Sequence, residues 1–181
     1  AHEMGFKVIL DWVANHTGRD HAWTVDHKDW YFLDSLGNLA TQYDWTDIAP
    51  LNYENNPALY DAMEAQMKFW IDRGVDGFRC DVASEVPTDF WEKAFGDFRQ
   101  AHPDALFFLA EAENPALQKN AFDAYYAWRQ MHLWYELAKG EKNANDLADF
   151  YVNYADPTGM PAGTLAMNFV SNHDQNSWSG T

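Results

Sequence analysis

The sequence has 181 residues, of which 47% are hydrophobic, enough to build the buried core of one ordinary domain. Its 12 basic and 28 acidic residues give a formal net charge of −16, which argues against nucleic acid and anionic membrane surfaces as partners. No run of 18 apolar residues predicts a membrane span, and the single cysteine, Cys80, excludes an internal disulfide.

The N-terminal part predicts a buried strand followed by a long insertion. The first residues resemble the last turn of a helix ending at Gly5, without an initiator methionine, so we expect an internal fragment of a longer protein. Residues 6–13 ("FKVILDWV") form a short apolar run with β-branched residues, which indicates a buried strand. Residues 17–56 follow, rich in polar and aromatic residues, and connections of this length are usually functional.

From residue 57 onward, strands alternate with helices. Helices are predicted from an N-cap at Asn56 to Gly74, from an N-cap at Thr88 to His102, and over 128–139 and 143–154. Strands are predicted at 75–81, 105–111, 121–127 and 164–171. This alternation predicts a parallel sheet with helical crossovers, an α/β fold.

The spacing of polar residues favours a barrel. Asp81 and Glu111 are 30 residues apart and Glu111 and Asp174 are 63 apart, close to two further units of the same length. A repeat near 30 residues, with polar residues where strands end, is typical of a (β/α)8 TIM barrel. The alternative, a doubly wound open sheet, has no glycine-rich phosphate loop to support it. Five strands are visible, so we expect a partial barrel.

Charged and polar side chains lie at or just beyond the ends of four of the predicted strands. They are Asp11, Asn15 and His16, then Arg79 and Asp81, then Glu111, then His173 and Asp174. Each alone also fits a structural ion pair, a solvated loop residue or a helix cap. Together they would meet at one edge of a parallel sheet. Several carboxylates without a metal cage point to glycoside hydrolysis, where one carboxylate is ionised and a second is kept protonated. An arginine beside the first would keep it ionised.

Four motifs in order resemble those of the α-amylase family, glycoside hydrolase family 13. They are "DWVANH" (11–16), "GFRCDVA" (77–83), "LAEAE" (109–113) and "FVSNHD" (169–174), and "TDIAPLNYEN" (46–55) resembles a further motif near the end of the inserted B domain. The resemblance implies about strands 3 to 7 of the catalytic barrel. Residues 1–16 would hold a barrel strand and the preceding helix end, 17–56 a short B-domain insertion, and 57–181 the remainder of the barrel.

The resemblance also implies roles for single residues. Asp81 would be the nucleophile, Glu111 the general acid/base and Asp174 the third carboxylate, which grips sugar hydroxyls. Arg79 would hold Asp81 ionised, His16 and His173 would hydrogen-bond the sugar, and Asp11 would be mostly structural. Glu113 fits a substrate contact or a solvated loop carboxylate.

A structural calcium is the one metal that the resemblance suggests, and the chemistry itself requires no cofactor. In many relatives the asparagine matching Asn15 binds calcium together with an aspartate of the B-domain motif. Here that second position is Pro50, which offers no side-chain ligand.

The sequence therefore predicts a retaining glycoside hydrolase that acts on α-glucosidic bonds of starch-like glucans or malto-oligosaccharides through a covalent glycosyl-enzyme intermediate. The first alternative is a transglycosylase of the same family, of the amylosucrase, branching or glucanotransferase type. The second is a non-catalytic binding or scaffold relative, against which the joint presence of Arg79, Asp81, Glu111 and Asp174 argues. We expect the 181-residue chain alone to be poorly stable and inactive.

Overall fold

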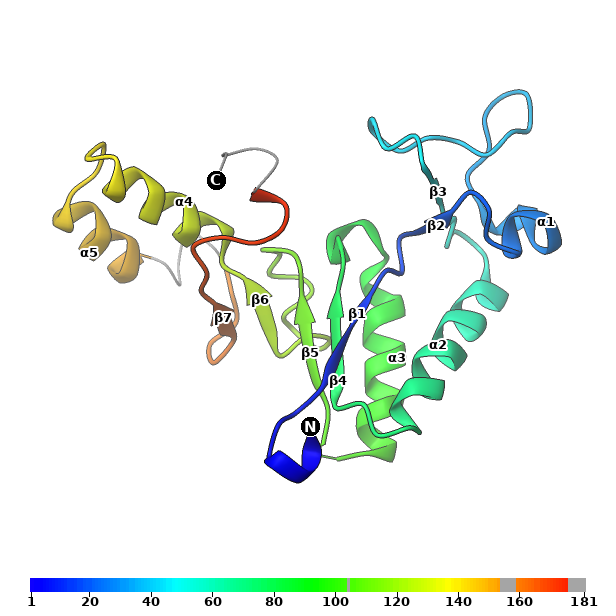
Figure 1. Ribbon diagram of the computed structural model, residues 1–181, viewed down its shortest axis with the longest axis horizontal. Coiled ribbons are helices and arrows are strands. Elements are labelled where there is room, and N and C mark those ends of the chain that lie inside the picture. Colours follow the sequence, from blue (N-terminus) through cyan, green and yellow to red (C-terminus); the bar gives the residue numbers. More distant parts are fainter. Residues whose placement is uncertain (104, 154–158, 176–181) are drawn as a thin grey trace.

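A five-stranded parallel sheet forms the centre of the computed structural model, which describes residues 1–103, 105–153 and 159–175 (Figure 1). The strands run in the order β1 (Ile9–Trp12), β4 (Gly77–Cys80), β5 (Phe107–Ala110), β6 (Ala124–Tyr126) and β7 (Leu165–Met167). Each new strand is added to the same side of the sheet. A doubly wound sheet reverses its order at a switch point, so this order is that of a barrel wall.

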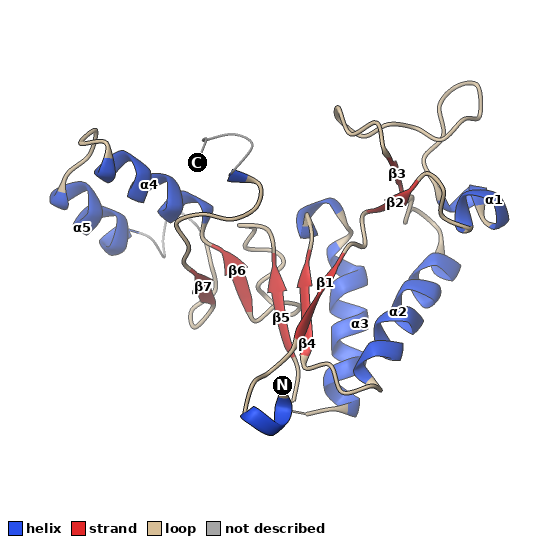
Figure 2. Cartoon of the chain, in the orientation of Figure 1, coloured by secondary structure: helices blue, strands red, loops and turns tan. Residues whose placement is uncertain are grey.

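Helices cover one face of this sheet (Figure 2). They include α2 (Pro57–Ile71) and α3 (Thr88–Ala101), with α4 (Trp128–Ala138) and α5 (Ala144–Asn153) at the β6–β7 end. Asn56 caps α2 as predicted, because its side chain accepts a hydrogen bond from the backbone N–H of Leu59. The predicted cap at Thr88 is wrong by one residue: α3 already includes Thr88, and Pro87 is its N-cap.

Alternation along the strands separates a core face from a barrel face. Phe78 and Phe108 are fully buried against the helices, and Phe108 stacks on Phe95 of α3 with ring centroids 3.7 Å apart. The neighbouring residues Arg79 and Leu109, which are register partners, point to the opposite face. Cys80 is fully buried on the core side, as expected of a packing residue.

Strand β4 approaches β5 closely at Gly77. Its φ is +147°, and a Cβ at this position would lie 1.8 Å from the backbone oxygen of Phe107. Only glycine fits such an approach without moving a strand.

The barrel face is partly open to solvent. Ile9, Phe107 and Leu165 lie on it and are 36%, 37% and 57% exposed. Among the described residues, no helix is long and apolar enough to cross a membrane.

The insertion between β1 and α2 forms a small unit of its own above the carboxyl end of the sheet (Figure 1). It holds the antiparallel pair β2 (His16–Gly18) and β3 (Ile48–Pro50), the short helix α1 (Trp23–Asp26) and the turn η2 (Lys28–Trp30). Near the C-terminal end of the insertion, the hydroxyl of Tyr53 donates to the carbonyl of Ala14, just after β1, over 2.7 Å. This hydrogen bond joins the two ends of the insertion. The treatment of the insertion as a domain with boundaries at residues 16 and 56 stays a prediction.

Candidate active site

Arg79 is the centre of the candidate site. It lies on β4 with 8% of its surface exposed, and its strand neighbours are β1 and β5. Its Nη1 donates to Oδ1 of Asp11 at 2.9 Å and to Oδ1 of Asp81 at 2.8 Å. Its Nη2 makes a 2.7 Å ion-pair contact with Oε1 of Glu111, without the alignment of a hydrogen bond. One guanidinium thus draws together carboxylates from three adjacent strands, and the predicted meeting of Asp11, Arg79, Asp81 and Glu111 at one edge is confirmed.

Tyr126, the last residue of β6, holds Arg79 from the other side. Its hydroxyl accepts a hydrogen bond from Nε of Arg79 at 3.2 Å, and the Arg79 Cζ lies 5.4 Å from the centre of its ring. Burial lowers the pKa of Arg79, but the bonds to Tyr126 and Asp81 and the charge of Glu111 outweigh it and raise the pKa. The sequence analysis missed Tyr126, although its place at the end of a predicted strand was a usable signal.

Glu111 follows β5, and only 9% of its side chain is exposed. Burial, together with the charges of Asp81 and Asp174, raises its pKa to about 7 against the opposing effects of the Val82 hydrogen bond and the Arg79 charge. Near neutral pH a large fraction of this carboxyl is therefore protonated, as a proton donor requires.

The residue after Asp81 has a strained backbone that serves Glu111. Val82 has a φ of +35°, which is rare for a β-branched residue. In this conformation its N–H donates to Oε2 of Glu111 at 2.8 Å. This hydrogen bond from the residue next to Asp81 orients the carboxyl of Glu111.

Asp81 is more accessible than Glu111, with 24% of its side chain exposed. Its backbone N–H donates to the carbonyl of Trp12, which fixes the chain just past β4. Its Oδ1 forms an ion pair with Nη1 of Arg79 at 2.8 Å. Both carboxyls thus pair with Arg79, but the Asp81 side chain is 24% exposed and the Glu111 side chain only 9%.

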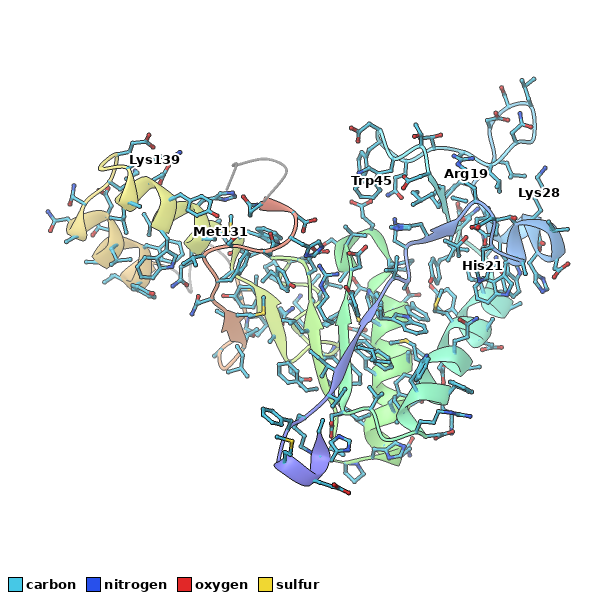
Figure 3. All side chains as sticks on the ribbon, in the orientation of Figure 1. Arg19, His21, Lys28, Trp45, Met131 and Lys139 are labelled. Carbon is cyan, nitrogen blue, oxygen red and sulfur yellow. The ribbon has the colours of Figure 1, made fainter. Side chains whose placement is uncertain are left out.

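His16 begins β2 beside this cluster. Burial lowers its pKa, although the charges of Asp81 and Asp47 act in the opposite direction, and this shift favours the neutral ring. The ring of Trp45 lies 5.9 Å from the ring of His16. Figure 3 places Trp45 on the side of the insertion nearer to the sheet, whereas Arg19, His21 and Lys28 lie farther out.

Asp174 and His173 lie in a turn beyond β7, which ends earlier than the predicted strand 164–171. The segment after β7 curves back over the carboxyl ends of β5 and β6 (Figure 1). The charge of Asp174 contributes to the raised pKa of Glu111, which joins it to the site. The Nε2 of His173 lies 3.4 Å from Oδ1 of Asp174, and 70% of the His173 side chain is exposed. Their roles toward a substrate stay predictions.

Glu113 contacts the first turn of α4. Its two oxygens bind the backbone N–H and the Nε of Arg129 in α4, each at 2.9 Å, and 8% of its side chain is exposed. These bonds satisfy the first turn of α4, which favours a helix cap over a substrate contact.

The residues around Asn15 do not fit the calcium site that the family resemblance suggests. The Nδ2 of Asn15 donates to Oε1 of Gln42 at 2.7 Å, so this nearby oxygen is already used. Pro50 pairs with His16 across β2 and β3 and brings no side-chain oxygen. Within the described part of the chain, no group of three His, Cys, Asp or Glu residues could hold a metal ion.

Comparison with known proteins agrees with this geometry. The family model described as "Alpha amylase, catalytic domain" matches residues 26–139, and the chain belongs to this family of enzymes. The chain is 30% identical over 141 residues to the alpha-1,4-glucan:maltose-1-phosphate maltosyltransferase of Arcanobacterium haemolyticum, covering 71% of this chain and 20% of that protein. It is also 30% identical over 192 residues to the alpha-amylase MalA of Haloarcula japonica, covering 97% of this chain and 27% of that protein.

Solved structures confirm the partial (β/α)8 barrel. The crystal structure of an alpha-amylase from Lactobacillus plantarum superposes with a TM-score of 0.87 at 29% identity, covering 96% of this chain and 44% of that one. The maltogenic alpha-amylase AmyB from Thermotoga neapolitana gives 0.85 at 31% identity, covering 96% and 40%. The chain thus spans less than half the length of each of these relatives.

Proposed function

We propose that this chain carries the catalytic centre of a retaining glycosidase that acts on α-glucosidic bonds of malto-oligosaccharides or starch-like glucans. One observation carries the proposal: two of the three carboxyls that contact the Arg79 guanidinium lie in different environments. Asp81 is accessible and paired at 2.8 Å, while Glu111 is buried with a pKa of about 7. This is the pair of states that a nucleophile and a proton donor need.

In the first step, an oxygen of Asp81 attacks the anomeric carbon of the sugar. The bond from that carbon to the glycosidic oxygen breaks, and the leaving oxygen takes the proton of Glu111. In the second step, the Glu111 carboxylate takes a proton from water, whose oxygen displaces Asp81 from the anomeric carbon. Two inversions leave the configuration unchanged. We expect the two carboxyls to lie roughly 5–5.5 Å apart, the spacing of retaining enzymes.

The remaining polar residues would hold the sugar while this happens. His16 and the pair His173 and Asp174 would hydrogen-bond its hydroxyls, and Arg79 would keep Asp81 ionised while Tyr126 holds Arg79. These hydrogen bonds would accelerate the reaction to the extent that they are stronger in the oxocarbenium-like transition state, with its flattened sugar ring, than in the bound substrate.

A transglycosylase is the second candidate, and the maltosyltransferase name of several relatives favours it. The first step is the same. In the second, the hydroxyl of another sugar replaces water as the acceptor, so the same residues serve both reactions.

The test uses the complete protein that contains this chain, incubated with maltoheptaose and followed by proton NMR of the new anomeric centres. We expect the α-anomer to appear first, either as new reducing ends or, for the transglycosylase, in longer oligosaccharides. Asp81→Asn should lower turnover by about three orders of magnitude or more, while Glu113→Gln, a matched loss of a carboxylate at a helix cap, should retain it. First appearance of the β-anomer would contradict the retaining mechanism.

A further inference from the structure

A series of hydrogen-bonded side chains, called the relay below, connects the candidate active site with the insertion. It starts at Glu85, the last residue of the turn η3 (Ala83–Glu85), four positions after Asp81. Oε2 of Glu85 accepts a hydrogen bond from Nε2 of Gln42 at 3.0 Å, and Oε1 accepts one from the hydroxyl of Tyr43 at 2.8 Å. An ionised carboxylate can only accept, so Gln42 must present its nitrogen to Glu85.

The orientation of Gln42 determines the orientation of Asn15. With its nitrogen directed at Glu85, the Gln42 amide turns its Oε1 to the other side, where it accepts from Nδ2 of Asn15 at 2.7 Å. Asn15 is buried, with 4% of its surface exposed, so an unmatched amide there would be costly. Asn15 therefore has to present nitrogen, not oxygen, toward Gln42.

The last link reaches His16. The Asn15 Nδ2 has two hydrogens, and the second points at Nδ1 of His16, 3.1 Å away. A nitrogen that receives this hydrogen has to be an acceptor, so in the neutral ring the proton sits on Nε2. The donor and acceptor of each hydrogen bond in the relay are thus determined by the preceding hydrogen bond, and the first is determined by the carboxylate of Glu85.

The loop that carries Gln42 is itself held in place. The guanidinium of Arg19 donates to the backbone carbonyls of Leu39, Ala40 and Thr46 at 3.2, 2.7 and 2.8 Å. Gln42 is thus presented to Glu85 and Asn15 by a loop fixed on both sides of it.

We infer that Glu85 is a positioning residue which, through Gln42 and Asn15, fixes His16 in the tautomer with its proton on Nε2. The Nε2–H group is then the donor that His16 offers to a sugar hydroxyl, and this use of the tautomer rests on the proposed function. The tautomer itself does not depend on it.

The test is nitrogen NMR of the histidine rings in the complete protein labelled with 15N-histidine, with His16 assigned from its loss in His16→Gln. Nδ1 and Nε2 have well-separated shifts when the proton is fixed on one of them. In the unmodified protein we expect a protonated Nε2 and an unprotonated Nδ1.

Two variants should change this state. Gln42→Met removes the hydrogen bonds of Gln42 to Glu85 and Asn15 and so interrupts the relay. The shifts of Nδ1 and Nε2 of His16 should then move toward each other as the two tautomers mix. Glu85→Lys replaces an acceptor with a donor at an exposed position. This substitution should flip the side-chain amides of Gln42 and Asn15, which would move the proton of His16 to Nδ1.

Tyr43→Phe is the matched control, because it removes the other hydrogen bond to Glu85 and leaves the relay from Glu85 to His16 intact. It should leave the His16 shifts and turnover unchanged. Gln42→Met should lower kcat/KM by about two- to tenfold, the equivalent of one neutral hydrogen bond. If His16 keeps its proton on Nε2 in both Gln42→Met and Glu85→Lys, the inference is overturned. If the tautomer responds but no α-glucoside is turned over, the inference stands and the proposed function fails.

Discussion

At the scale of single residues, environment separates two carboxyls that the sequence presents alike. Asp81 and Glu111 both end a strand, and both contact Arg79. Burial distinguishes them, since it penalises the charge of Glu111, while Asp81 remains accessible beside the guanidinium. The proposed roles, with Asp81 as nucleophile and Glu111 as proton donor, rest on this difference.

The first prediction concerns pH. The pKa of Glu111 is raised to about 7, and the protonated form is the proton donor, so kcat/KM of the complete protein should fall as pH rises through about 7. Glu111→Gln should lose this limb of the profile along with a factor of about 10² to 10⁴ in rate. A profile that stays flat from pH 6 to 9 would show that another group donates the proton.

The second prediction concerns Tyr126. Tyr126→Phe removes the acceptor of the Arg79 Nε, a buried charged donor, and should lower the free energy of unfolding of the complete protein by about 1–3 kcal/mol in urea denaturation. Tyr135→Phe is the control, because its hydroxyl bonds the carbonyl of Val170 at an exposed position. It should cost clearly less, and equal costs would mean that Tyr126 does not hold Arg79.

At the scale of elements, the sequence was sufficient for the order of strands and helices outside the insertion and for the meeting of Asp11, Arg79, Asp81 and Glu111, but not for β2, α1 and β3 within the insertion. Short β-branched runs and an apolar helix face are local signals, and parallel strands bring their carboxyl ends together without further information. Strand lengths were overestimated, most of all at 164–171, where only Leu165–Met167 is paired.

The contacts that the sequence could not reveal join residues far apart in the chain. Gln42 meets Glu85 from 43 positions away, and Arg79 meets Tyr126 from 47. No periodicity encodes such contacts, because they depend on how the insertion and the barrel wall come together. The pKa of Glu111 is of the same kind, since it arises from burial by several strands.

The third prediction compares two glycines. In the complete protein, Gly77→Ala should lower the free energy of unfolding by at least about 2 kcal/mol, because its Cβ would overlap the backbone of β5 and its φ of +147° is unfavourable for alanine. Gly96 lies inside α3 with no atom within 4 Å of an added Cβ. Gly96→Ala should therefore stabilise by about 0.5–1 kcal/mol in the same urea series. Similar effects of the two changes would contradict the close approach of β4 and β5.

At the scale of the whole molecule, the described residues build one wall of a barrel with an insertion above its carboxyl end. The helices cover the outer face of this wall, whereas apolar residues of the inner face, such as Phe107 and Leu165, are 37% and 57% exposed. A sheet with open edges and an uncovered apolar face is prone to association.

The fourth prediction follows for the 181-residue chain produced alone. It should bind a hydrophobic dye, show no sharp thermal transition and turn over no α-glucoside. Calorimetry and dye binding measure the first two. A cooperative transition together with turnover would mean that this part of the barrel is sufficient by itself.

The most direct measurement is to trap the covalent intermediate. In Glu111→Gln of the complete protein, α-maltosyl fluoride should still react, because fluoride leaves without a proton, while the second step lacks its base. The account predicts that mass spectrometry finds one maltosyl group attached to the peptide that contains Asp81, and none when Asp81→Asn is added. A maltosyl group on another residue, or steady release of the inverted product without any attached sugar, would contradict it.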